Sequence, residues 1–145
     1  MLIDTSVLVR TLQPHHPLCA AAKKAIAQLR LEQHTLHLVP QNFMELWVVA
    51  TRPVDKNGLG MSVTGVCGEL VRLKHFFTVL PETEDVFPAW ERLVAAYKVL
   101  GKPAHDARLV AAMQVHGITD ILTFDRAGFA RYAGIKVVNP AEVGA

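Results

Sequence analysis

Cysteine, charge and long apolar runs are all scarce in this sequence, and each shortage excludes a class of protein. Only two of the 145 residues are cysteines, Cys19 and Cys67, and their separation matches neither a redox pair nor a metal-binding pair. Charged residues make up 19% of the chain, which is low for a disordered protein. No apolar run approaches the roughly 18 residues that a membrane-spanning helix requires.

The first residues also lack the features of a secretory signal. Asp4 follows only two apolar residues, Leu2 and Ile3, whereas a signal peptide needs a longer apolar segment. Free thiols are typical of reducing compartments. We therefore expect a cytoplasmic protein with unpaired cysteines and no membrane contact.

Apolar side chains, in contrast, are plentiful. Hydrophobic residues make up 51% of the chain, and its length suits one domain with a full core, so we expect residues 1–145 to form a single domain. Lys and Arg total 15 against 13 Asp and Glu. If several acids gather in one site, the remaining surface has a positive surplus that suits a polyanionic partner, although an ordinary mixed surface fits the same composition.

Two apolar periodicities alternate along the chain and predict alternating strands and helices. Short apolar stretches predict strands at about 1–4, 36–39, 76–80, 121–124 and 136–138. Three- and four-residue spacing predicts helices at about 5–12, 18–33, 40–51, 63–75, 88–100 and 103–116. Thr5 and Ser6 are expected to cap the first helix, and Ser62 the fourth. The alternation predicts an α/β fold, a three-layer α/β/α sandwich around a mostly parallel sheet.

Two acidic residues follow apolar strands in this scheme. Asp4 ends the first strand and Asp125 comes directly after the strand at 121–124. Ligands of open parallel sheets bind at the carboxyl ends of the strands. We therefore expect Asp4 and Asp125 to lie at the same edge of the sheet.

Two further acids fall on helices among apolar residues. Glu45 shares a helix face with Asn42, Val48 and Val49, where an unpaired carboxylate would be costly. Asp106 is in the first turn of its helix, on the face of Leu109, Val110 and Met113. For Asp106 alone, a favourable interaction with the helix dipole accounts for its position equally well.

Together the four acids form a candidate metal site. Clustered carboxylates raise one another's pKa and need a cation to neutralise them. Oxygen ligands favour Mg²⁺ or Mn²⁺, and no His or Cys spacing offers a zinc site. Asp120 precedes its strand and is expected at the opposite end, as a solvated turn residue.

Four segments resemble the PIN domain in order and spacing, most closely the VapC-like toxins of bacterial toxin–antitoxin systems. The resemblance covers residues 2 to about 140. The segments are Met-Leu-Ile-Asp-Thr-Ser-Val-Leu-Val9, Asn42-Phe-Met-Glu45, His105-Asp-Ala-Arg-Leu109, and Leu122-Thr-Phe-Asp125 followed by Phe129. The resemblance implies a PIN-like nuclease domain, a metal-dependent endoribonuclease in which these acids are the catalytic metal ligands. It also implies a small antitoxin partner and a homodimer.

The resemblance extends to two hydroxyl residues and fails at one position. Ser6 and Thr123 match hydroxyl residues that support the site in the family. Many relatives carry a further acid just before the Phe of the last motif, and here that residue is Gly128. In that loop the site therefore depends on Asp125 alone.

Five basic residues lie close in sequence to the proposed ligands and are candidates for RNA binding. They are Arg52, Lys56, Lys102, Arg108 and Arg126. Contact with RNA phosphates and ordinary solvation are both compatible with their positions.

Two other acid-rich α/β classes fit less well, and one alternative function stays open. A receiver-type phosphoacceptor domain needs paired acids after its first strand and a later lysine, and a haloacid-dehalogenase-like phosphatase needs an Asp where this chain has Ser6. A non-catalytic PIN-fold module that binds RNA or a protein partner is the remaining alternative. The intact set of four acids favours the nuclease.

Overall fold

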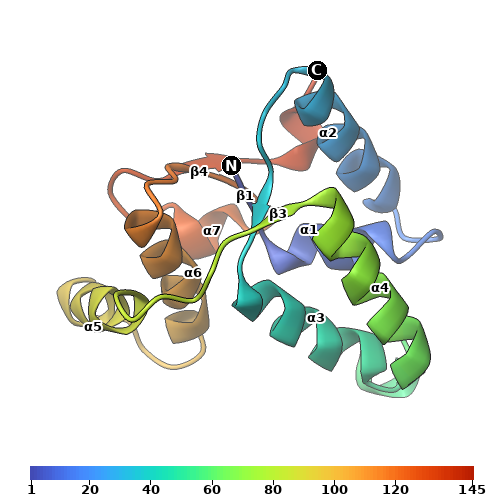
Figure 1. The fold of residues 1–145 in the computed structure, drawn as a ribbon, viewed down its shortest axis with the longest axis horizontal. Coiled ribbons are helices and arrows are strands. Elements are labelled where there is room, and N and C mark those ends of the chain that lie inside the picture. The colour runs from blue at the N-terminus through green and yellow to red at the C-terminus, as the bar shows by residue number, and fades with distance from the viewer.

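Five short parallel strands form a single sheet at the centre of the computed structural model, which describes residues 1–145 (Figure 1). They are β1 (Leu2–Ile3), β2 (His37–Leu38), β3 (Thr78–Val79), β4 (Asp120–Leu122) and β5 (Lys136–Val138). Their spatial order is β3-β2-β1-β4-β5, and every neighbouring pair is parallel. The predicted sheet is confirmed, and it is parallel throughout rather than mostly.

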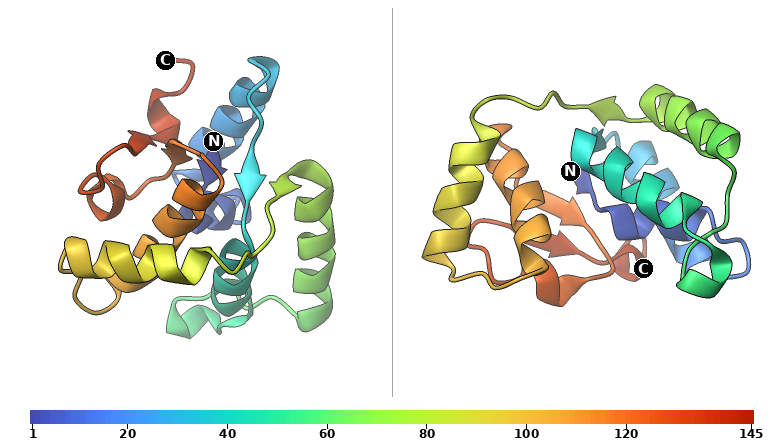
Figure 2. Two further views of the ribbon diagram at one scale, coloured as in Figure 1. Left: turned by 60° about the vertical axis from the view of Figure 1, so that its left-hand side comes forward. Right: turned by 90° about the horizontal axis from the view of Figure 1, so that it is seen from below.

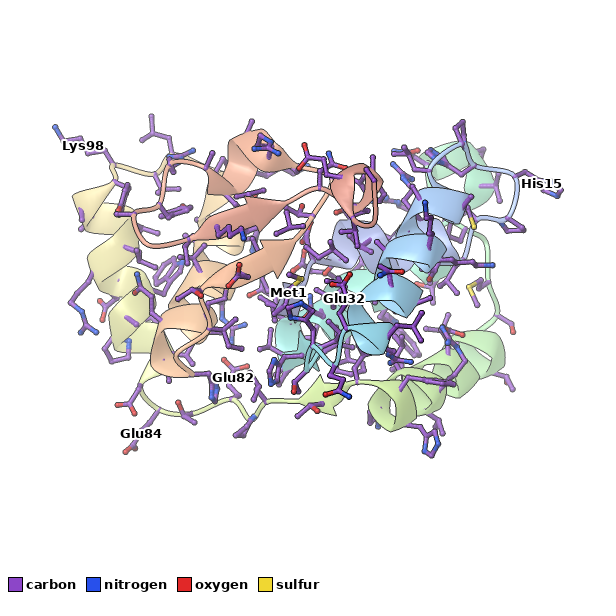
Figure 3. All side chains as sticks on the ribbon, turned by 90° about the horizontal axis from the view of Figure 1, so that it is seen from above. Met1, His15, Glu32, Glu82, Glu84 and Lys98 are labelled. Carbon is purple, nitrogen blue, oxygen red and sulfur yellow. The ribbon has the colours of Figure 1, made fainter.

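Seven α-helices and two short 3₁₀ turns connect the strands. The helices are α1 (Thr5–Thr11), α2 (Cys19–Leu31), α3 (Pro40–Thr51), α4 (Val63–Phe76), α5 (Val86–Ala96), α6 (Pro103–Val115) and α7 (Arg126–Phe129). The 3₁₀ turns are η1 (Val54–Lys56) and η2 (Pro140–Glu142). Figure 2 shows α5 and α6 on one side of the strands and α1 to α4 on the other. In Figure 3 the loops carrying His15 and Lys98 mark opposite ends of the molecule.

The sheet separates two hydrophobic cores because successive side chains of a strand point to opposite faces. Leu2 and Ile121 belong to the core that α5 and α6 complete. Ile3 and Leu122 belong to the core shared with α1, α2 and α3. All four side chains are fully buried. This arrangement confirms the predicted three-layer α/β/α sandwich.

Several helix boundaries follow from single residues. Pro40 and Pro103 begin α3 and α6, where a missing backbone N–H costs nothing. Ser62 caps α4 as predicted, because its Oγ accepts the N–H of Gly65 at 3.0 Å. Thr5 and Ser6 are not caps: the cap position of α1 is Asp4, which makes no side-chain capping bond because it lies in the site described below.

Other predicted boundaries were wrong by a few residues. α5 begins at Val86, so Pro88 lies within its first turn, and it ends at Ala96 because Lys98 adopts a left-handed conformation. Strands β2 and β3 are two residues long rather than four or five. Asp120 is the first residue of β4 rather than preceding it. None of the helices combines the length and the apolar character needed to cross a membrane.

Candidate metal centre

All four predicted acids line one open cavity at the carboxyl edge of the sheet. The cavity has a volume of about 360 Å³ and is lined mainly by polar residues. Asp4 follows β1, Glu45 lies on α3, Asp106 lies on α6, and Asp125 precedes α7. The parallel sheet brings the ends of β1 and β4 together, since Leu2 pairs with Ile121 and Ile3 with Leu122.

Asp4 is the most firmly held of the four carboxylates. Its side chain is buried, and Ser6 Oγ and Thr123 Oγ1 both donate to Asp4 Oδ2, at 2.6 and 2.7 Å. Thr123 Oγ1 also accepts the backbone N–H of Asp125 at 2.9 Å. The two predicted supporting residues thus contact Asp4 directly, and Thr123 ties the two strand ends to each other.

Asp125 and Asp106 approach one another beside Gly128. Asp125 is the cap of α7, and its Oδ1 accepts the N–H of Gly128 at 3.1 Å. A methyl group at Gly128 would lie 2.6 Å from Asp125 Oδ2 and 3.1 Å from Asp106 Oδ2. Both contacts are shorter than van der Waals distance. The departure from the family pattern at Gly128 therefore leaves room for both carboxylates beside it.

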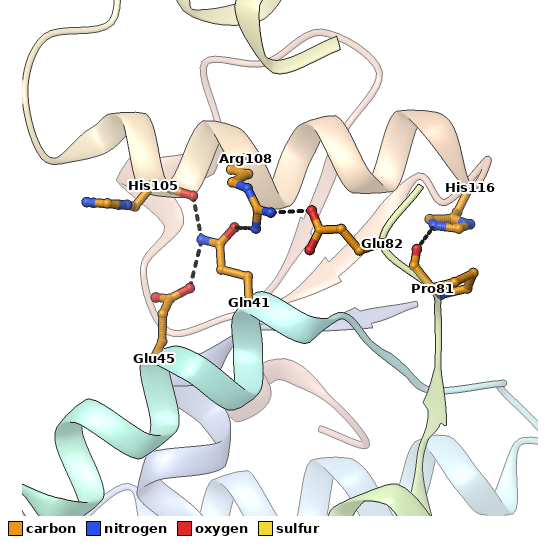
Figure 4. A network of polar contacts seen from close by, with 7 residues as sticks. All are labelled: Gln41, Glu45, Pro81, Glu82, His105, Arg108 and His116. Atoms are coloured by element: carbon orange, nitrogen blue, oxygen red, sulfur yellow. Dashed lines mark hydrogen bonds and ion pairs between the residues drawn. The ribbon is translucent and has the colours of Figure 1, made fainter. Parts of the chain in front are cut away.

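Glu45 is positioned by an amide that sequence analysis did not single out (Figure 4). Gln41, one turn earlier on α3, donates through Nε2 to Glu45 Oε1 at 2.8 Å and to the carbonyl of His105 at 2.7 Å. Its Oε1 accepts from Arg108 Nη1 at 3.1 Å, and Arg108 also pairs with Glu82. Gln41 thus connects α3 to α6 next to the cavity.

A second buried amide fixes α3 to the first strand. Asn42 Oδ1 accepts the N–H of Val39 at 2.8 Å, and its Nδ2 donates to the carbonyl of Ile3 and to Thr5 Oγ1. These bonds set the position of the helix that carries Glu45. The neighbours expected for Glu45 were only partly right, because Val48 is 57% exposed.

Burial and mutual repulsion make the ionised form of these acids costly. Burial, together with the charges of Asp4 and Asp106, raises the pKa of Glu45 to about 7 against the bond from Gln41. Burial, followed by Asp4 and Asp125, raises the pKa of Asp106 to about 6. Burial also raises the pKa of Asp4, although Ser6 and Thr123 oppose it. A cation in the cavity would relieve this cost.

The donor set fits a hard divalent cation, although the carboxylates are not closed around one point. All four are oxygen donors, as Mg²⁺ and Mn²⁺ prefer. No group of three His, Cys, Asp or Glu side chains is close enough to hold an ion as it stands. Glu45 is held by Gln41 and Asp125 by Gly128, so converging on an ion would require these carboxylates to shift.

The predicted RNA-binding residues are spread more widely than expected. Of the five, only Arg52 lines the cavity. Lys56 and Lys102 are exposed on neighbouring loops, in η1 and just before α6. Arg108 pairs with Glu82, and Arg126 pairs with Glu142 at 2.9 Å. Of these candidates, Arg52 therefore shares the cavity with the acids, and RNA contact by any of the five stays a prediction.

The cavity also contains polar residues that sequence analysis missed. Arg10 and Gln13 line it from α1 and the following loop, and Asn57 lines it together with Arg52. Gln41, beside the cavity, had a usable signal, because residues four apart on a helix are neighbours. Arg10 had none, because its place depends on how α1 packs against α3.

Comparison with solved structures gives the same architecture. FitAcB from Neisseria gonorrhoeae is 20% identical, with 97% of this chain and 98% of that chain covered and a TM-score of 0.68. A toxin–antitoxin complex from Klebsiella pneumoniae is 20% identical, with 96% of each chain covered and a TM-score of 0.64. VapC20 from Mycobacterium tuberculosis, a toxin described as cleaving the sarcin–ricin loop, is 21% identical, with 89% and 92% covered and a TM-score of 0.64.

Sequence comparison assigns the family. No curated protein sequence matches the chain. The family model described as the PIN domain matches residues 1–135, which include all four acids and the ends of β1 and β4. The chain therefore belongs to the PIN-domain family.

Proposed function

We propose that this protein is a Mg²⁺- or Mn²⁺-dependent endoribonuclease and the toxin of a type II toxin–antitoxin pair. The observation that carries the proposal is the single cavity lined by Asp4, Glu45, Asp106 and Asp125. Family membership supports nuclease chemistry, and the similar folds of toxins in toxin–antitoxin complexes support the toxin assignment.

Each acid has a separate contribution in this proposal. Asp4 would be the fixed ligand, since two hydroxyls hold its Oδ2. Glu45 has a pKa of about 7 and only Oε1 held by Gln41, so Oε2 can take up a proton or a cation at neutral pH. Asp106 and Asp125 would hold the opposite side. When bound, the metal would activate a water and offset charge on the phosphate.

The direct test is cleavage of RNA by purified protein. We expect cleavage with Mg²⁺ or Mn²⁺, ends carrying 5′-phosphate and 3′-hydroxyl groups, and full inhibition by EDTA. Cleavage that persists in EDTA would contradict the metal mechanism. RNA binding without cleavage in either metal would support the non-catalytic module instead.

Asp106→Asn separates a catalytic role from a structural one. We expect it to abolish cleavage while leaving the metal-free protein as stable or more stable, by about 0.5–2 kcal/mol, because it removes a repelled carboxylate. Urea unfolding in EDTA measures this. The control is Glu91→Gln on the exposed surface of α5. A clear loss of stability in Asp106→Asn would show that the charge of Asp106 stabilises α6 by interacting with the helix dipole.

The partner proposals are a small antitoxin and a homodimer. Similar folds occur in toxin–antitoxin complexes from Klebsiella pneumoniae and, bound to promoter DNA, from Rickettsia felis. Co-expression with the product of a short gene directly upstream should yield a stable complex that does not cut RNA. Light scattering on the purified protein measures the oligomeric state, and a monomer at all concentrations would contradict the dimer.

A further inference from the structure

We propose that Arg10 and Arg52 together bind a backbone phosphate of the RNA, one next to the phosphate held at the carboxylates. This inference rests on the proposed ribonuclease function and adds a substrate-positioning site to it. Arg52 was a sequence candidate, whereas Arg10 and the pairing of the two were not. Both arginines line the same cavity as the four acids.

Each guanidinium is held at one nitrogen and unsatisfied at another. Arg10 Nη1 donates to Gln13 Oε1 at 2.7 Å, and Arg52 Nη2 donates to the carbonyl of Asn57 at 2.9 Å. In both residues the Nε group is buried and has no hydrogen-bond partner. A buried donor without an acceptor is costly. Because the Nε groups are enclosed by the protein, an incoming anion would meet the terminal nitrogens, and Arg10 Nη2 and Arg52 Nη1 form no hydrogen bond. The two side chains are therefore oriented in advance and keep a free terminal nitrogen.

The missing acceptor is not a carboxylate of this chain. Neither Arg10 nor Arg52 forms an ion pair, whereas Arg108 pairs with Glu82 and Arg126 with Glu142. The guanidinium fork binds phosphate oxygens through two parallel hydrogen bonds. Arg10 and Arg52 are the two cationic residues that line the cavity, so an anion entering there would meet both.

A helix-dipole role and an acidic protein partner each account for only part of this arrangement. Arg10 is in the last turn of α1, where a cation stabilises the helix dipole, but that role does not account for Arg52 in the same cavity. An acidic residue of a partner protein would also satisfy a guanidinium. RNA fits better because its phosphates recur at every nucleotide, so one held at the carboxylates brings its neighbour into the same cavity.

The first test measures binding of a fluorescein-labelled single-stranded RNA by anisotropy in Ca²⁺, with a gel to show that the RNA stays intact. We expect Arg10→Met and Arg52→Met each to weaken binding about tenfold, as for one charge-assisted contact. Because the two arginines share one phosphate, substituting both should reduce the slope of log K against log salt by about 0.7, and each single substitution by no more than that. The matched control is Arg92→Met on the exposed surface of α5, which should leave both quantities unchanged.

Two further variants keep the test decisive if a methionine variant folds poorly. Thermal unfolding shows whether each variant is folded. Arg10→Lys and Arg52→Lys keep the charge without the fork, so we expect the salt slope to stay and the affinity to fall in part. Wild-type affinity and slope in all folded variants would overturn the inference, and so would variants that lose a protein partner yet bind RNA normally.

A charge-neutral linkage in the RNA locates the contact. Once the cleavage position is mapped in Mg²⁺, a methylphosphonate is placed at the adjacent linkage or, as a control, at a distant one. The adjacent substitution should weaken binding to the wild type about tenfold but have little effect on the doubly substituted Arg10→Met, Arg52→Met protein. An equal effect on both proteins would contradict the phosphate contact with the two arginines, but it would leave the proposed ribonuclease function standing. A wild type that neither binds nor cuts RNA overturns the proposed function as well.

Discussion

Asp4 differs from the other three acids in how completely its surroundings fix it. Burial and two hydroxyl donors restrain its side chain, whereas Glu45 and Asp106 are half-buried and have strongly raised pKa values. Groups that orient a metal ligand contribute to affinity without touching the metal. The contribution of Thr123 should therefore be measurable separately from the acids.

Thr123→Val replaces the hydroxyl with a methyl of similar size. It removes the bond to Asp4 Oδ2 and leaves the backbone N–H of Asp125 without its acceptor. We expect affinity for Mn²⁺ to fall about tenfold to hundredfold, measured by calorimetry. The control is Thr64→Val on the exposed surface of α4. Unchanged affinity in Thr123→Val would mean that Ser6 alone can orient Asp4.

Glu45 makes the stability of the metal-free protein depend on pH. Its pKa is raised from 4.5 to about 7 on folding, so between these values the folded state binds more protons than the unfolded state. Stability should therefore fall as pH rises from about 4.5 to about 7. We expect the melting temperature in EDTA to fall over this range.

The matched variants for this prediction are Glu45→Gln and Glu91→Gln. Glu45→Gln should flatten the pH dependence and stabilise the protein at pH 8, whereas Glu91→Gln on exposed α5 should follow the wild type. Saturating Mg²⁺ at pH 8 should raise the melting temperature of the wild type, because ligand binding to the folded state stabilises it. A wild type that becomes more stable from pH 5 to pH 7 in EDTA would contradict the assignment.

At the level of elements, the longer helices and the strand ends could be predicted and the small ones could not. An initial proline and apolar spacing indicate helices such as α3 and α6. The four residues of α7 carry no periodic signal, and their helix exists because Asp125 caps it. The site could be predicted to the same extent. Its acids follow recognisable strands or lie on recognisable helices, so they could be found from the sequence. The places of Gln41 and Arg10 beside or in the cavity depend on tertiary packing and could not.

Gly128→Ala tests whether the carboxylates of Asp106 and Asp125 need the space beside Gly128 in α7. The new methyl would contact Asp125 Oδ2 and Asp106 Oδ2, which are ends of flexible side chains that can move away. We expect unfolding free energy to change by less than about 1 kcal/mol, because Ala also favours a helix, while cleavage falls at least about tenfold.

The control for that change is Gly68→Ala in α4. Nothing lies within 4 Å of a methyl group there, so this variant should gain up to about 1 kcal/mol of stability and keep full cleavage. Normal cleavage by Gly128→Ala would mean that the carboxylates do not need their present positions.

At the scale of the whole molecule, positive charge is spread over several places: two arginines line the cavity, and others lie outside its lining. Arg126 and Arg108 are each paired with a glutamate. We expect Arg126→Ala or Arg108→Ala to weaken RNA binding across sequences and to reduce the salt slope by no more than about 0.7, one phosphate on a single strand. Affinity for metal should not change in Arg126→Ala, whereas Arg108→Ala also removes a bond to Gln41, which positions Glu45. A larger loss of slope would place the main RNA path over these residues.

The pairing of β1 with β4 also determines which segments of the chain must come together to form the site. The N–H of Asp4 bonds to the carbonyl of Leu122, and its carboxylate accepts from the hydroxyl of Thr123. The site thus joins residues that are 119 positions apart in the sequence. Under the proposed function, splitting the chain in the loop at residues 98–102 should give two fragments that do not cut RNA separately and regain cleavage when they reassemble.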